Sequence, residues 1–238
     1  MNPVLAWRRE RLPMPLFGLL ASYLAFAAMG GFSGILNSTL SVFVLRMAVA
    51  WCLVAAFRIW DDIADRQCDL IKAPDRVLVG VERLGPFWVT SLVSLTLGVL
   101  GSFTFNGFGS VVLILGVASC FGAFYRWGIG HRHHWVLTKY PLIVFALGGH
   151  NWTILLLVYL SFCIYEHIDE PEIRDVPGAL FRLIPYFLGI GLIVCILDSG
   201  LSLWLVPWAI ATCLTLFGFI HRRSEFAPTF LFFSILVF

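Results

Sequence analysis

The sequence predicts an all-α polytopic membrane bundle of about nine transmembrane helices, and three observations support this fold class. Of the 238 residues, 60% are hydrophobic and only 13% are charged, with a mean hydropathy of +0.90. Soluble domains carry about 25% charged residues, so the surface of this chain suits lipid rather than water. The apolar residues also gather into nine runs, and the basic residues fall in alternate connections between these runs.

Each apolar run is expected to form one helix of a single domain that covers residues 1–238. The runs are 14–32, 39–60, 86–105, 110–125, 136–148, 151–165, 180–197, 201–220 and 228–238. The fifth run is interrupted by Gly148-Gly149-His150-Asn151, which predicts a short, tilted or broken helix. The last run is only about half as long as the roughly 20 residues that a span needs.

The basic residues indicate the orientation of the chain. They precede the first run and lie around every second connection, whereas connections 32–38, 104–110 and 148–151 contain no Lys or Arg. By the positive-inside rule, the N-terminus and every second connection face the cytoplasm. We therefore expect a multi-pass protein of the cytoplasmic (inner) membrane. The arginines before the first run also fit a signal peptide, but the many spans that follow favour a retained helix.

Charge and cysteine content exclude other classes of protein. The net charge of +2 is too small to suggest a nucleic-acid partner. The six cysteines form neither a CxxC pair nor a zinc-type spacing. We expect them to be free thiols that pack as small apolar side chains.

Four aspartates follow the second apolar run at a helical spacing. If the helix continues, Asp62, Asp65 and Asp69 lie on one face, with Asp61 at its edge. Carboxylates one turn apart repel each other, and a divalent cation removes that repulsion. Mg²⁺ prefers one or two carboxylates together with phosphate oxygens and water. The face is thus suited to a metal–diphosphate complex, and a solvated acidic helix end is the alternative.

Basic residues close to this face strengthen the diphosphate interpretation, because each can neutralise phosphate oxygens. These residues are Arg66, Lys72 and Arg76.

A second acidic cluster follows the sixth run and faces the same side by topology. Glu166, Asp169 and Glu170 can share a helical face, and Glu172 follows Pro171, which is expected to end or redirect the helix. Together the two clusters could hold two ions or both ends of one metal–diphosphate.

The first cluster carries a family resemblance. Asp61-Asp62-x-x-Asp65-x-x-x-Asp69, followed by Lys72-Ala73-Pro74-Asp75-Arg76, resembles the first signature of the UbiA-type intramembrane prenyltransferases. That signature reads N-D-x-x-D-x-x-x-D and then a stretch ending near D-R-P, so Asp61 replaces Asn and Val77 replaces Pro. The second signature, typically D-x-x-x-D, has no match, although Glu166-x-x-x-Glu170 has its spacing. The nine-run layout also matches, so the resemblance covers essentially the whole chain.

The resemblance implies an Mg²⁺-dependent transferase built as a helical bundle around a central cavity. Its partners would be an isoprenyl diphosphate, a hydrophobic acceptor and membrane lipid. The implied metal ligands are Asp61, Asp62, Asp65, Asp69, Glu166, Asp169, Glu170 and Glu172, and the implied diphosphate-binding residues are Arg66, Lys72, Arg76, Arg126 and Lys139. Among these residues, Asp62, Asp65 and Lys139 are expected to be catalytic.

Aromatic side chains near the cytoplasmic ends of the runs could stabilise the allylic cation. Tyr125, Tyr140 and Tyr165 offer π faces for this purpose, and an interfacial aromatic belt explains them equally. Lys139 is either a diphosphate contact or a lysine that snorkels to the interface.

Two further features lie outside the motif. The histidines His131, His133 and His134 fit a polar interfacial loop, because no other ligand pattern accompanies them. Arg46 lies inside the second run, and an intramembrane arginine is a candidate functional residue. It stands roughly 22 Å from the aspartates along a helix, too far to contact a metal there.

Two other functions remain open. An intramembrane terpene cyclase would quench the cation within the isoprenoid chain of the substrate itself and would need no acceptor. A non-enzymatic ion-binding or transport protein would carry charged residues along a path through the membrane, and only Arg46 has such a position.

Overall fold

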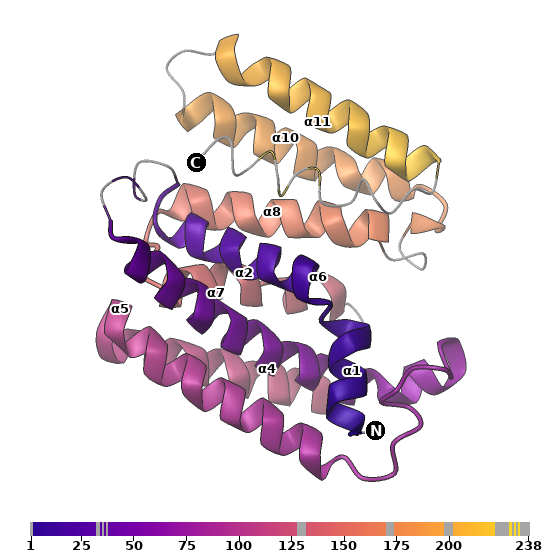
Figure 1. Ribbon diagram of the computed structural model, residues 1–238. Coiled ribbons are helices and arrows are strands. Elements are labelled where there is room, and N and C mark those ends of the chain that lie inside the picture. The colour runs from indigo at the N-terminus through magenta and orange to yellow at the C-terminus, as the bar shows by residue number, and fades with distance from the viewer. Residues whose placement is uncertain are drawn as a thin grey trace. The chain divides into compact units, whose positions relative to one another are not determined.

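The all-α prediction is confirmed by the computed structural model (Figure 1). It describes residues 2–31, 34, 36, 38–127, 132–169, 174–197, 202–221, 229, 231 and 233, and no strand occurs among these residues. The helices are α1 (Pro3–Arg11), α2 (Met14–Ala28), α4 (Leu40–Lys72), α5 (Gly85–Trp127), α6 (Arg132–Leu137), α7 (Lys139–Ala146), α8 (Trp152–Asp169), α10 (Ala179–Leu197) and α11 (Ser202–Ile220).

Three helices are long and apolar enough to cross a membrane, among the residues that the structure describes. They are α4, α5 between Gly85 and Tyr125, and α8. Shorter apolar helices occur at 17–28, 135–146, 179–195 and 207–220. Eight of the nine expected runs therefore form helix, whereas most of the ninth run lies outside the described residues.

The chain divides into two compact units. The first comprises residues 1–25, 38–129 and 143–148, and the second comprises residues 26–37, 130–142 and 149–238. The first unit contains α1, most of α2, α4 and α5. The second contains α6, α8, α10 and α11.

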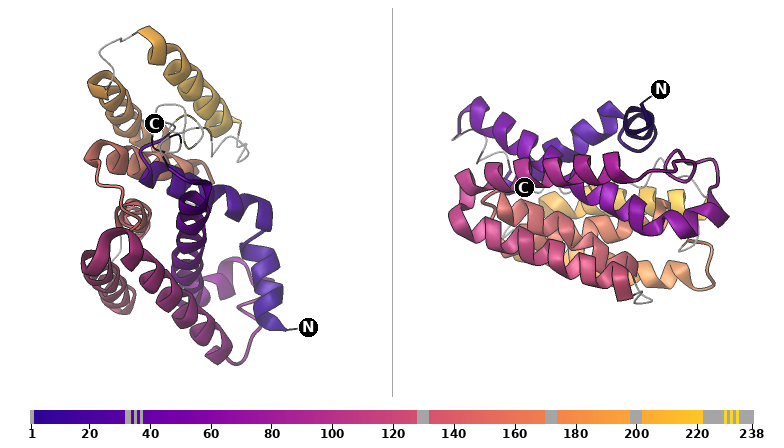
Figure 2. Two further views of the ribbon diagram at one scale, coloured as in Figure 1. Left: turned by 60° about the vertical axis from the view of Figure 1, so that its left-hand side comes forward. Right: turned by 90° about the horizontal axis from the view of Figure 1, so that it is seen from below.

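Helix α5 is in fact two helices joined by a bend, as the third and fourth runs predicted. Asn106 and Gly107 have non-helical backbone angles, and Gly107 has a φ of 57°, which favours glycine. The hydroxyl oxygens of Ser102 and Ser110 are only 3.2 Å apart, although eight residues of straight helix would span about 12 Å. The chain therefore turns back at Gly107 (Figures 1 and 2).

Glycines allow α5 to pack closely on α4. A Cβ atom at Gly98 would lie 2.5 Å from Leu53 Cδ2, and a Cβ at Gly101 would overlap Val49. The Ser91 hydroxyl also donates to the Ala56 carbonyl at 3.0 Å. Small residues at such crossings are typical of helices that associate in membranes.

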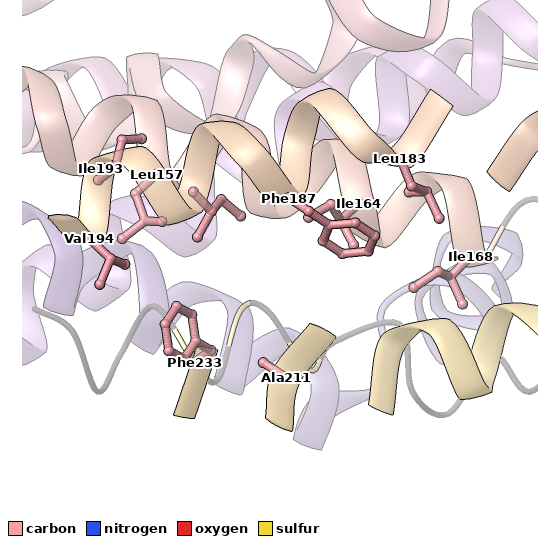
Figure 3. Packing of buried hydrophobic residues seen from close by; sticks show 10 residues of the cluster. Leu157, Ile164, Ile168, Leu183, Phe187, Ile193, Val194, Ala211 and Phe233 are labelled. Carbon is pink, nitrogen blue, oxygen red and sulfur yellow. The ribbon is translucent and has the colours of Figure 1, made fainter. Parts of the chain in front are cut away.

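The second unit has its own apolar core on α8, α10 and α11 (Figure 3). On α8 it contains Leu157, Ile164 and Ile168, which recur at helical spacing. On α10 the same spacing brings Leu183, Phe187, Ile190 and Val194 into the core. This core fixes the end of α8, where the second acidic cluster begins.

The fifth run is broken, as expected, and the break lies within it. Helices α6 and α7 meet at Thr138, and α7 ends before Gly148, which has a φ of 92°. Lys139 is thereby the first residue of α7 rather than part of a continuous span.

Candidate functional site

The first acidic cluster lies on a continuous helix. Helix α4 runs from Leu40 to Lys72 without a Gly or Pro and ends at Ala73, directly before Pro74. Because the helix continues beyond the apolar run, Asp62, Asp65 and Asp69 share one face, as the spacing predicted. Asp62 and Asp69 are buried, and Asp65 is half-buried.

Asp62 is the most densely contacted carboxylate of this face. Its Oδ2 atom accepts hydrogen bonds from Trp7 Nε1 at 2.8 Å and from Arg11 Nε at 3.1 Å. Its Oδ1 atom accepts from Arg11 Nη2 at 2.9 Å and lies 3.6 Å from Arg58 Nε. Arg11 thus binds Asp62 through both oxygens, the geometry in which a guanidinium and a carboxylate interact most strongly. Asp62 as a whole residue is only 5% exposed.

Asp69 and the loop after α4 form a second ion pair. Arg76 Nη1 donates to Asp69 Oδ1. The hydrogen bond that Arg76 donates to the Asp69 carboxylate holds the pKa of Arg76 above its usual value, so this guanidinium stays charged at any physiological pH. The sequence predicted Arg76 beside the aspartates, and the structure brings the two together.

Arg66 was predicted to bind diphosphate, and in the structure it contacts backbone instead. Its Nη2 atom donates to the carbonyl oxygens of Val79 and Val81. These contacts tie the loop that follows α4 back onto the helix. Lys72 is the last residue of the helix and is exposed.

Asp61 faces an aromatic group on α5. The Tyr125 hydroxyl donates to Asp61 Oδ1, and the Tyr125 ring lies against those of Trp60 and Phe121, with centroids 6.4 and 6.3 Å away. Tyr125 therefore lies beside the aspartate face, where an aromatic ring was predicted.

Four residues of this site were missed by the sequence interpretation. Trp7, Glu10 and Arg11 belong to the short helix α1, which Asn2 caps through a 2.9 Å hydrogen bond to Val4 N. The arginines before the first run indicate on which side of the membrane they lie, but they do not indicate which carboxylate each one contacts. The contact of Arg58 could have been predicted, because Arg58 lies four residues before Asp62 on the same helix.

The second acidic cluster is described only in part. Glu166 is half-buried and Asp169 is exposed at the end of α8, whereas Glu170 and Glu172 lie outside the described residues. His167, between them, is buried, and its Nδ1 lies 2.8 Å from the Cys163 carbonyl oxygen. That histidine was not singled out from the sequence.

Lys139, Tyr140 and Tyr165 are the remaining predicted site residues whose side chains the structure describes. Lys139 is only 4% exposed, and its Nζ lies 5.4 Å from the centroid of the Tyr140 ring. Such burial does not fit a snorkelling side chain. Tyr140 stacks on Phe162 with centroids 3.6 Å apart, and Tyr165 packs against the core of the unit. The side chains of Arg126, His133 and His134, and all of His131, lie outside the described residues.

Arg46 lies far from the aspartates, as expected. Its guanidinium carbon is 5.0 Å from the centroid of the Phe105 ring, close to the bend of α5. The Nε atom is buried and has no hydrogen-bond partner.

The carboxylates of α4 have the right chemistry for Mg²⁺, and in this structure two of them pair with guanidiniums. Hard oxygen ligands suit Mg²⁺, yet guanidinium groups engage Asp62 and Asp69. Within the described part of the chain, no group of three or more His, Cys, Asp or Glu residues is placed to hold a metal ion.

Comparison with known proteins supports the fold. No family model and no curated protein matches the chain. Among solved structures, the chain is similar to the apo structure of a UbiA homolog from Aeropyrum pernix K1, with a TM-score of 0.66 and 16% sequence identity. The alignment covers 93% of this chain and 94% of that one. The resemblance first noted at the aspartates is confirmed at the level of the fold: the chain is an integral membrane protein with the helical fold of a UbiA homolog.

Proposed function

We propose that the chain is an intramembrane prenyltransferase, which moves an isoprenyl group from an allylic isoprenyl diphosphate to a hydrophobic acceptor. The observation that carries this proposal is the network of carboxylates and guanidiniums at the end of α4, on a chain with the fold of a UbiA homolog. A membrane protein needs no such network for lipid contact, and charged groups at membrane helices commonly serve function.

The chemistry requires a cationic site for the leaving group. The allylic C–O bond breaks, and its electron pair stays on the diphosphate. Guanidiniums stabilise this developing charge best when they are already fixed in place, as Arg11 and Arg76 are by their carboxylate partners. The acceptor then forms a bond to the allylic carbon and loses a proton. Tyr125, whose hydroxyl donates to Asp61, places an aromatic ring beside this site.

The Mg²⁺ requirement remains a prediction. Asp65 is the carboxylate of the aspartate face that is best suited to test it, because it belongs to the motif and is half-buried rather than fully enclosed. Lys139 and the second acidic cluster are proposed to take part in diphosphate binding, as the family resemblance implies.

Product analysis tests the transferase against the cyclase. Purified protein in nanodiscs is incubated with geranylgeranyl diphosphate and Mg²⁺, with and without an extract of bacterial membrane lipid. Release of diphosphate only with the extract, together with a prenylated lipid, supports the transferase. Release with a cyclic hydrocarbon in the absence of extract supports the cyclase. No release under either condition, over several chain lengths, argues against both enzymes and favours an ion-binding protein.

A further inference from the structure

Asp62 holds two guanidiniums that belong to different helices. Arg11 reaches it from α1 and Arg58 from the preceding turn of α4. We propose that Asp62 is a positioning residue, which clamps Arg11 and Arg58 together as a diphosphate-binding pair and does not ligate metal. This inference rests on the proposed function, because the diphosphate is the ligand that the pair would bind.

The hydrogen-bonding capacity of Asp62 supports this assignment. A carboxylate offers about four acceptor positions on its two oxygens. Trp7 and Arg11 both donate to Oδ2. Arg11 also donates to Oδ1, and Arg58 lies close to the same oxygen. A metal ion could bind Asp62 only after these donors had left, and it would then lie beside two positive charges.

The charged groups of the network act on one another. Asp69 and Asp62 raise the pKa of Arg76 and Arg58 lowers it, so these four side chains interact electrostatically. Without Asp62 between them, Arg11 and Arg58 would repel each other and separate.

Helix α1 is held at this place by two further contacts besides those with Asp62. The Trp7 side chain is 2% exposed and meets Phe87 edge-on, with ring centroids 6.1 Å apart. Glu10 Oε2 accepts a hydrogen bond from Val77 N at 3.0 Å, which attaches the loop after α4. Arg11 is therefore presented on a rigid support, as a residue that must meet a phosphate group requires.

The first experiment separates a clamp from a metal ligand. Equilibrium binding of geranylgeranyl S-thiolodiphosphate to the full chain in nanodiscs is measured across an Mg²⁺ titration and in EDTA. For Asp62→Asn we expect affinity to fall by about tenfold or more both with Mg²⁺ and in EDTA, with an unchanged Mg²⁺ concentration for half-maximal binding. Arg11→Gln should behave like Asp62→Asn, and Arg11→Lys should recover part of the affinity. Asp65→Asn, by contrast, should shift the Mg²⁺ dependence.

The opposite pattern would overturn the proposal. If Asp62→Asn raises the Mg²⁺ concentration needed for binding and leaves binding in EDTA at the wild-type level, Asp62 is a metal ligand. If the wild-type chain binds no diphosphate at all, the diphosphate part of the inference fails together with the proposed function.

A second measurement needs no ligand and therefore distinguishes these failures. Hydrogen–deuterium exchange of residues 3–11 should become faster in Asp62→Asn. It should stay unchanged in Asp75→Asn, which removes an exposed carboxylate from the neighbouring loop. Unchanged exchange in Asp62→Asn would contradict the clamp. If Asp62→Asn does not fold, Trp7→Phe removes one donor to Asp62 and keeps a ring on Phe87, and faster exchange is again expected.

Discussion

At the scale of single residues, the aspartates of α4 differ in their partners although the sequence presents them as equivalent. Asp62 meets Trp7 and two arginines, Asp69 meets Arg76, and Asp61 meets Tyr125. The pairing with Arg76 was close to the prediction, because both residues belong to the motif, and Tyr125 was expected near this face. Arg58 lies on α4 itself, whereas Trp7 and Arg11 come from α1, and sequence spacing does not tell which distant helix packs beside α4.

Arg66 provides a prediction at this scale. Because its guanidinium donates to two loop carbonyls, Arg66→Gln should destabilise the fold by about 1–3 kcal/mol. It should also speed amide exchange in residues 77–81 and weaken diphosphate binding less than Arg76→Gln does. Thermal unfolding and exchange measurements check the first two effects. A loss of binding as large as that in Arg76→Gln, with a loop that exchanges as in wild type, would restore Arg66 as a direct phosphate contact.

Tyr125 tests the role proposed for the aromatic ring. Tyr125→Phe loses the hydrogen bond to Asp61 but keeps the π face, so stability should fall by about 1–2 kcal/mol while prenyl transfer persists. Tyr125→Leu loses both features and should lose most of the turnover rate at saturating substrate. Equal turnover in the Phe and Leu variants would show that the ring does not stabilise a cation.

At the scale of helices, the sequence predicted where the helices lie better than where they extend or break. The apolar runs located α2, α8, α10 and α11 to within a few residues, because hydrophobic length follows from the thickness of the membrane. The extension of α4 to Lys72 was conditional on the aspartate spacing and is confirmed. Helix α1 was not predicted, since its nine residues include three arginines and form no apolar run. The break at Thr138 was not predicted, although Pro141 marks it, because a proline cannot bond to the Leu137 carbonyl four residues earlier in a continuous helix.

Because α4 and α5 are in close contact, we expect a methyl group added at their contact to lower the stability of the protein. A Cβ at Gly101 would overlap Val49, so Gly101→Ala should lower stability by about 1–3 kcal/mol. Gly116→Ala is the matched control, because nothing lies within 4 Å of its added Cβ, and it should be neutral or slightly stabilising. Thermal unfolding in detergent compares the two, and equal midpoints would contradict the close packing.

At the scale of the whole molecule, the basic connections predict which side of the membrane each loop faces, and this orientation can be measured. Cys68 is exposed near the end of α4, on the expected cytoplasmic side. With the other cysteines replaced by Ala, Cys68 should react with a membrane-impermeant maleimide only after cells are opened. A cysteine placed at Phe108 in the bend of α5 should react in intact cells. Reversed labelling would place the aspartates outside and contradict the proposed site.

The central claim is that this membrane protein binds an isoprenyl diphosphate through the charged network of α4. The most direct test is equilibrium binding of geranyl, farnesyl and geranylgeranyl S-thiolodiphosphates to the wild-type chain in nanodiscs, with the corresponding alcohols for comparison. We predict saturable binding of at least one diphosphate, competition by inorganic diphosphate, and loss of this binding in Arg76→Gln. Equal binding of diphosphates and alcohols, or no binding at any chain length, would contradict the claim.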